Sequence, residues 1–132
     1  DANGSPVGAP IAAGELLHDG PVTIAAASTV PYYSSRLRFF PHADAARAVD
    51  GGFHLRVSTA RPAEIVRHLP GIFDGTYHNP QTVFDFAVTA IDIESDEPMP
   101  CHAGGDVLDR TTRLHIALAD RGVPLLRRSK SG

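Results

Sequence analysis

The chain of 132 residues contains no tryptophan, one methionine and a single cysteine, Cys101. A single cysteine excludes an internal disulfide framework and is typical of a reducing compartment, so we expect a cytoplasmic location. The sequence has no apolar run close to the roughly 20 residues that a membrane-spanning helix needs. Its first residues contain neither the basic nor the apolar stretch of a signal peptide.

The charge of the chain is low and shows no concentrated positive region. The formal net charge is −3, and the 12 Lys and Arg residues form no dense basic patch, so no nucleic-acid partner is expected. The hydrophobic fraction of 42% and the length are ordinary for one globular domain with a buried core. Eleven prolines and twelve glycines indicate many short elements separated by turns, which favours a β-rich fold.

Composition divides the chain into three parts. Residues 1–20 are rich in Gly, Pro and Ala and are interpreted as a linker or lead-in segment. Residues 21–128 are predicted to form one β-rich domain, and residues 129–132 a polar tail. Because the chain starts without methionine and ends in this tail, we interpret it as a piece of a longer protein.

Apolar runs and alternation predict several strands. Residues 22–28 form a compact apolar run between turn signals, which is typical of a strand buried on both faces. Residues 36–39 and 53–57 alternate polar with apolar side chains, so each is expected to have one wet face. Within residues 83–94 the alternation changes phase at residues 89–90, which predicts two strands joined there.

Turn signals divide the second half of the chain. Residues 95–98 and 104–105 are predicted to be turns. Apolar residues over 114–118 and 123–126 predict two further strands. Segment 85–109 holds seven acidic residues and no Lys or Arg, and is interpreted as a solvated strand face.

One principal helix is predicted over about residues 60–74. Pro62 suits a first helical turn, and Ile65, Leu69 and Phe73 recur at helical spacing, so these three are expected to pack onto a sheet. The predicted fold is therefore mainly β, a two-sheet β-sandwich of short antiparallel strands with one principal helix.

The order of short motifs along the chain resembles one known family. The motifs that carry the likeness are, in chain order, Tyr32-Tyr33, Pro41-His42-Ala43, Asp50-Gly51, residues 75–80 and residues 91–100. Over about residues 20–126, this order is similar to the C-terminal domain of the diacylglycerol kinase family of bacterial-type lipid kinases. The order and spacing of the motifs are more specific than any one of them.

The resemblance implies a parent enzyme that transfers the γ-phosphate of ATP to a diacylglycerol-like lipid hydroxyl. In that family the C-terminal domain closes a cleft against the N-terminal nucleotide-binding domain of the same chain and contributes to the lipid site. The parent would use ATP and magnesium and could contact the membrane peripherally. The family's Gly-Gly-Asp-Gly-Thr nucleotide loop is absent here, so this chain alone is expected to be inactive and to hold no tightly bound cofactor.

Asp50 is the first site residue that the resemblance implies. In some members of the family the matching Asp binds a structural magnesium with backbone carbonyls, which here would belong to Arg47 and Gly52. Carboxylate and carbonyl oxygens are the hard ligands that magnesium prefers. A simpler interpretation stays open, because Asp-Gly is a common turn pair and Asp50 would then only cap a turn.

The second implied site is Gly104-Gly105-Asp106, where the family carries Asp-Gly-Glu. Gly104 stands where the family has an Asp assigned as general base or metal organiser, and Asp106 stands where it has the Glu. Asp106 is thus the remaining candidate for a catalytic carboxylate. A plain hairpin turn explains the same residues. The loss at Gly104 also leaves open a non-catalytic lipid- or ligand-binding β domain, a degenerate relative of the kinases.

Overall fold

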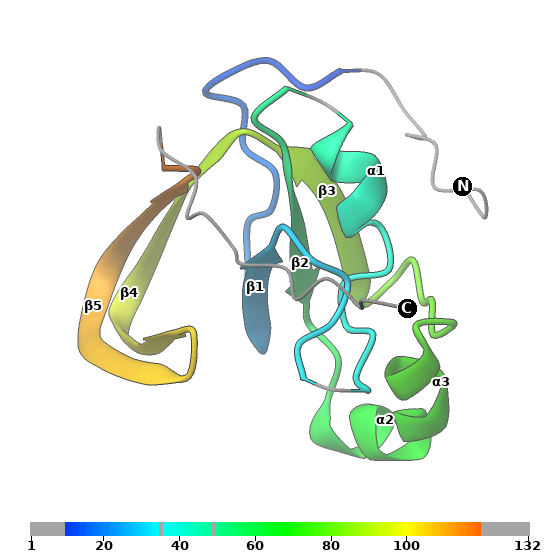
Figure 1. The fold of residues 1–132 in the computed structure, drawn as a ribbon. Helices are drawn as coiled ribbons and strands as arrows, with labels where there is room; N and C mark the ends of the chain where they lie inside the picture. The colour runs from blue at the N-terminus through cyan, green and yellow to red at the C-terminus, as the bar shows by residue number, and fades with distance from the viewer. Residues whose placement is uncertain (1–9, 35, 49, 120–132) are drawn as a thin grey trace.

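The computed structural model describes residues 10–34, 36–48 and 50–119. Within these residues the chain is mainly β, as predicted, with two antiparallel sheets and three short helices (Figure 1). One sheet has the strand order β1–β2–β3, and the other is a two-stranded ribbon of β4 and β5. The strands are β1 (Ile24–Ser28), β2 (Phe53–Ser58), β3 (Val83–Val88), β4 (Ala90–Ala103) and β5 (Asp106–Ala117).

The central strand β2 is buried on both faces. Its odd-numbered residues share one face with Phe86 of β3, because Leu55 is the register partner of Phe86. The ribbon approaches this face, where Ile116 and Phe53 line the same small hollow. The even-numbered residues of β2 point the other way, toward the short helix α1 (Ala43–Arg47).

The expectation of a wet face on β2 is therefore wrong. His54 and Arg56 are buried, and so is Ser58. The cause is a carboxylate on the neighbouring strand, Asp85, which accepts hydrogen bonds from both His54 and Arg56. A polar residue can lie in a core when its charge and its hydrogen bonds are satisfied there.

Of two other strand predictions, the one over residues 22–28 is confirmed in position by β1 but not in burial, and the one over residues 36–39 is wrong. Residues 22–28 were expected to be buried on both faces, but β1 is an edge strand among the described residues, and Ile24 is exposed. Residues 36–39 form no strand. Their backbone bonds instead tie a loop to distant segments: the N–H of Arg38 donates to the carbonyl of Phe73.

The predicted helix is two short helices, α2 (Pro62–Arg67) and α3 (Leu69–Asp74), which meet at His68. Pro70 lies in the first turn of α3, where its missing N–H costs nothing. In one continuous helix the Pro70 ring would clash with the carbonyl four residues earlier, so the chain restarts its helix instead.

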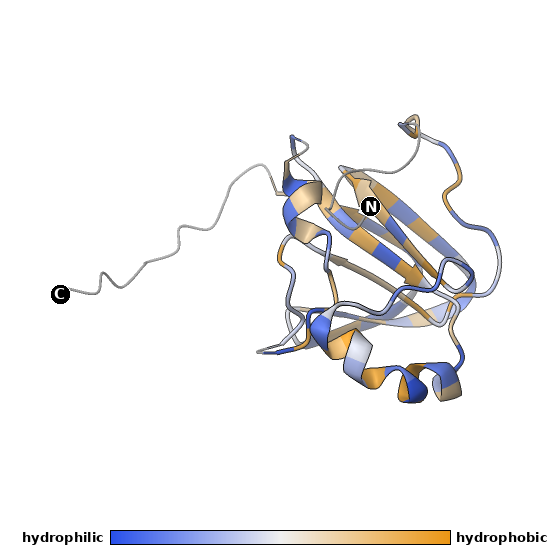
Figure 2. Cartoon of the chain, turned by 90° about the vertical axis from the view of Figure 1, so that its right-hand side faces the viewer, coloured by the Kyte–Doolittle hydropathy of each residue, from blue (hydrophilic) through white to orange (hydrophobic). Residues whose placement is uncertain are grey.

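Helices α2 and α3 bury none of their side chains against a sheet. Neither helix contains a buried residue, and Leu69 and Phe73 are exposed. The expected packing of Leu69 and Phe73 onto a sheet is therefore wrong. Figure 2 shows both helices at one end of the molecule, with apolar residues among them.

Two of the three predicted chain breaks in the second half are confirmed. Thr89 alone separates β3 from β4, and these strands lie in different sheets, so the phase change at residues 89–90 is confirmed as a junction of two strands. Gly104 and Gly105 form the turn between β4 and β5, with φ of 58° and 96°. Residues 95–98 are not a turn but part of β4, and they form the register shift between Glu94 and Met99.

The remaining predictions divide between described and undescribed residues. Residues 114–117 belong to β5, which starts earlier than expected, at Asp106. The part of the linker at residues 10–20 that the structure describes contains no strand. The strand predicted over residues 123–126 and the polar tail at 129–132 lie outside the described residues.

Candidate functional site

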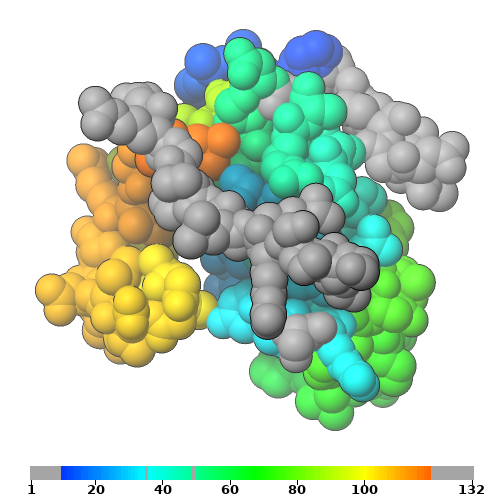
Figure 3. All heavy atoms as spheres, in the orientation of Figure 1, coloured from blue at the N-terminus to red at the C-terminus, as the bar shows by residue number. Residues whose placement is uncertain are grey.

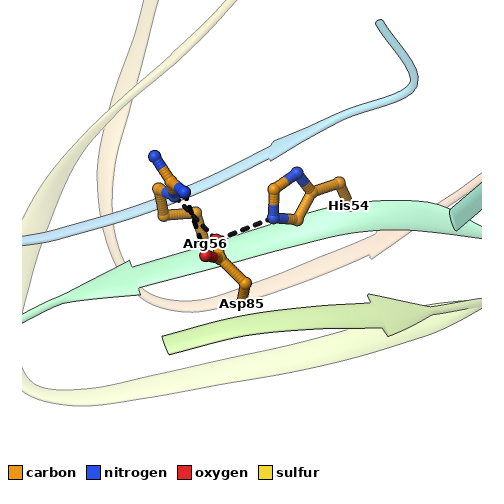
Figure 4. Close-up of polar contacts among 3 residues, drawn as sticks. All are labelled: His54, Arg56 and Asp85. Atoms are coloured by element: carbon orange, nitrogen blue, oxygen red, sulfur yellow. Dashed lines mark hydrogen bonds and ion pairs between the residues drawn. The ribbon is translucent and has the colours of Figure 1, made fainter. Parts of the chain in front are cut away.

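Three titratable side chains converge in the core between β2 and β3 (Figure 4). Arg56 and Asp85 are register partners, and His54 lies two residues earlier on the same face of β2, so all three meet on one side of the sheet. Arg56 holds both carboxylate oxygens, with Nε 2.7 Å from Oδ1 and Nη2 2.9 Å from Oδ2. The Nε2 atom of His54 lies 2.8 Å from the same Oδ1.

The hydrogen bonds and the Arg56 charge keep Asp85 ionised. Burial alone would raise the pKa of Asp85, but the bonds from His54 and Arg56 and the Arg56 charge hold that pKa far below its usual range. Asp85 is therefore an anion that balances Arg56. Its Oδ1 is an acceptor, so Nε2 of His54 carries a proton toward it, and Nδ1 of His54 is buried with no hydrogen-bond partner among the described residues.

An aromatic wall covers the cluster. The rings of Phe40 and His42 lie 5.7 and 5.5 Å from the His54 ring, centroid to centroid, and the Arg56 guanidinium lies 5.4 Å from the centroid of Phe39. Burial lowers the pKa of His42, Asp85 opposes this shift, and His54 and Arg56 add to it. His42 is therefore held in its neutral form near pH 7.

This arrangement supports the fold rather than contacting a substrate. The His54 and Arg56 side chains are almost completely buried, and Asp85 nearly so. Within the described residues, the cluster links β2 to β3 and lies under the Phe39–Ala43 segment. The family likeness pointed to none of these three residues. The sequence signal that could have found them is the pairing of Arg and Asp on neighbouring strands.

A second polar cluster fixes the α2 helix. Oε1 of Glu64 accepts hydrogen bonds from the Tyr77 hydroxyl at 2.5 Å, the Asn79 amide at 2.8 Å and the Thr82 hydroxyl at 2.7 Å. These bonds, the one from Tyr77 most of all, lower the pKa of Glu64. Residues 75–80 are one of the motifs of the family likeness, and in this structure they anchor α2.

Asp50 lies in the turn between α1 and β2, next to Gly51 at φ 70°, and is exposed. Arg47 ends α1, and its guanidinium pairs with exposed Asp44 at 2.7 Å. Gly52 directly precedes β2. No group of three His, Cys, Asp or Glu side chains among the described residues is placed to hold a metal ion. A magnesium site made of Asp50 and backbone carbonyls remains a prediction.

Asp106 lies at the tip of the ribbon, exposed and paired with Ala103 across the turn. The ring of His102, at the end of β4, is 6.2 Å from that of Tyr33, centroid to centroid. The tip of the ribbon thus meets the tyrosine turn, and Figure 3 shows these segments side by side. The Asp50 turn lies at the opposite end of the molecule in Figure 1, so the structure does not bring the two predicted sites together.

Comparison of the chain with protein-family models, with curated proteins and with solved structures finds no match. Among the described residues, no helix is long and apolar enough to cross a membrane. The case for a function therefore depends on the residues themselves and on their arrangement.

Proposed function

We propose that this chain is the C-terminal domain of an ATP-dependent lipid kinase whose acceptor is a diacylglycerol-like hydroxyl. The observation that carries the proposal is the contact between the tyrosine turn and the ribbon tip, through Tyr33 and His102. Tyr33 belongs to a motif that resembles the lipid kinases, His102 follows closely after the matching residues 91–100, and the two come from distant parts of the sequence. If the likeness of the separate motifs arose by chance, there would be no reason for these two segments to be in contact.

In this proposal the ribbon tip faces the nucleotide-binding domain of the parent protein. Asp106 is exposed at the end of the ribbon, so a second domain can reach its carboxylate. Phosphoryl transfer depends on positioning and charge, and a carboxylate at this place can orient the acceptor hydroxyl or help hold magnesium. ATP and magnesium would bind mainly to that other domain, because this chain has no phosphate-binding loop.

The test uses the reading frame that contains this chain together with its upstream sequence. Transfer of labelled γ-phosphate to diacylglycerol in mixed micelles is measured for the unchanged protein and for Asp106→Ala. We expect the variant to lower turnover by about 10²-fold or more, the scale of a positioned acid–base group. Asp109→Ala is the matched control, since Asp109 is exposed on the same strand, and it should leave turnover unchanged.

A variant at Gly104 tests whether the lost carboxylate can be restored. A Cβ at this position meets no atom within 4 Å, and Asp is among the residues that tolerate the left-handed backbone found there. Gly104→Asp should fold and raise turnover, if the missing family carboxylate limits the rate. Unchanged turnover in Asp106→Ala would show that the turn has only a structural role.

The absence of a side chain at Gly104 favours one second candidate, a non-catalytic lipid-binding β domain. The same experiment separates the two candidates. A parent protein that binds diacylglycerol micelles but transfers no phosphate, even with Gly104→Asp, would support the binding domain and reject the kinase.

A further inference from the structure

One end of the molecule exposes a cluster of large apolar side chains. We define the end patch as Tyr32, Tyr33, Leu69 and Phe73. Phe73 is 48% exposed and Tyr33 57% exposed, and the other two members are also exposed. Large apolar side chains are seldom gathered in this way on a surface that contacts only water.

The members of the end patch are neighbours in space. Tyr32 and Phe73 line the same open hollow, together with Arg36 and Asp74. Leu69 lies one turn before Phe73 in α3, and residues four apart share a helix face. The backbone bond from Arg38 to Phe73 fixes the loop after the tyrosine turn against this helix.

The helices that carry the patch are fixed by hydrogen bonds and by a tight turn. Glu64 anchors α2 through its three hydrogen bonds. Gly75 ends α3 in the left-handed conformation, at φ 77°. A Cβ at Gly75 would lie only 3.0 Å from the Arg38 side chain, so this close approach requires glycine. Phe73 and Leu69 are thus presented outward by two fixed elements.

Basic side chains surround the end patch. Arg36, Arg38 and Arg67 are exposed on the same helices and loop. Two acidic residues lie on the same helices: Asp74, whose carboxylate accepts hydrogen bonds from the backbone N–H and hydroxyl of Thr76, and Glu64, whose carboxylate accepts the three hydrogen bonds described above. Three arginines therefore stand against two carboxylates on this loop and these two helices, a small positive excess in a chain whose net charge is −3.

We propose that the end patch docks the protein on an anionic lipid bilayer. Tyrosine and phenylalanine at the level of the headgroups, with arginine around them, match the aromatic and electrostatic preferences of that interface. The helices project from the end of the molecule in Figures 1 and 2, so a flat surface can reach them. The family likeness implies peripheral membrane contact without naming a surface; the inference adds the surface that makes this contact, and it needs neither ATP nor a catalytic residue.

The chain offers a clean spectroscopic test, because it contains no tryptophan. In the full chain carrying Phe73→Trp, the single tryptophan should shift its emission to the blue on mixing with phosphatidylcholine vesicles that contain phosphatidylserine. Leu16→Trp is the matched control, since Leu16 is 77% exposed and the segment of residues 10–20 lies at the end of the molecule opposite α2 and α3 in Figure 1, so its emission should not move. A blue shift at Leu16 but not at Phe73 would overturn the proposal.

Sedimentation with vesicles tests the affinity. Leu69→Ser with Phe73→Ser should lower binding about tenfold or more, because the buried apolar area is lost. The control pair Ile11→Ser with Leu16→Ser, both exposed on the segment opposite the helices, should leave binding unchanged. Arg36→Gln with Arg67→Gln should abolish the preference for phosphatidylserine.

Three results would contradict the proposal: no binding of the unchanged chain to either kind of vesicle, equal loss in the control pair, or binding to an acidic polypeptide in place of vesicles. The last result would identify a protein partner. Each readout is independent of phosphate transfer, so an inactive parent enzyme would leave the docking result intact, and absent docking would leave the kinase assay intact.

Discussion

Two histidine–aspartate pairs with the same 2.8 Å separation lie in opposite environments. In the three-stranded sheet, the side chains of His54 and Asp85 are 1% and 13% exposed. In the ribbon, the side chains of His115 and Asp92 are 62% and 78% exposed. Because the nitrogen–oxygen distance is the same in both pairs, the difference in burial decides how much each pair contributes to the stability of the fold.

The difference concerns water. Around the ribbon pair, water screens the charges and hydrates either partner when the other is removed, so such pairs contribute little. In the sheet, water cannot hydrate the partner that remains. Removal of one residue there leaves a buried charge or hydrogen-bonding group unpaired. We therefore expect the same kind of substitution to have very different effects in the two regions.

The largest expected effect is at Arg56. Arg56→Leu leaves Asp85 as a buried charge bound only by His54, and should lower the free energy of unfolding by about 3–5 kcal/mol. Urea unfolding followed by circular dichroism measures it.

A second variant sharpens the interpretation of that loss. Arg56→Leu combined with Asp85→Leu removes both charges and should recover much of the stability. A double variant less stable than Arg56→Leu alone would show that the network contributes more than the compensation of one charge.

Acid should weaken the sheet in two stages. The pKa of His42 is lowered from 6.5 and that of Asp85 from 3.8. In both cases the unfolded chain binds a proton before the folded one, so stability falls as pH decreases, first below about 6.5 and then below about 3.8. Unfolding free energies measured from pH 8 down to about pH 2 follow these stages.

Single substitutions assign the two stages. His42→Phe should remove the stage below about pH 6.5, and Asp85→Asn the stage below about pH 3.8, on top of any constant loss. A steeper pH dependence in either variant would reverse the assignment.

The smallest expected effect is in the ribbon. Arg113 and Glu94 pair at 3.3 Å with both side chains mostly exposed. Arg113→Ala should change the free energy of unfolding by no more than about 1 kcal/mol. High salt should reduce even this effect. A loss as large as that of Arg56→Leu would mean that burial does not separate the two regions.

Features that depend on neighbouring residues in the sequence were predicted, and features that depend on contacts with residues far along the chain were missed. The glycines at 104 and 105 and the phase change at Thr89 are local signals, and both were found. The buried face of β2 depends on Asp85, which is remote in sequence, so alternation alone made His54 and Arg56 appear solvated. The site at Asp106 came from likeness to a family, and its exposure at the ribbon tip is compatible with that origin but does not test it.

The single residue between β3 and β4 gives the ribbon a mechanical property. Thr89 is the only residue that separates the two strands, and β4 runs for 14 residues beyond it. At about 3.3 Å per residue, the 14 residues of β4 span at most about 46 Å, and the register shifts within the strand shorten this span. The ribbon is held at both ends, by the Thr89 junction with the three-stranded sheet and by the contact of His102 with Tyr33 near the tip, so a rotation at Thr89 that displaced Asp106 would have to break that aromatic contact.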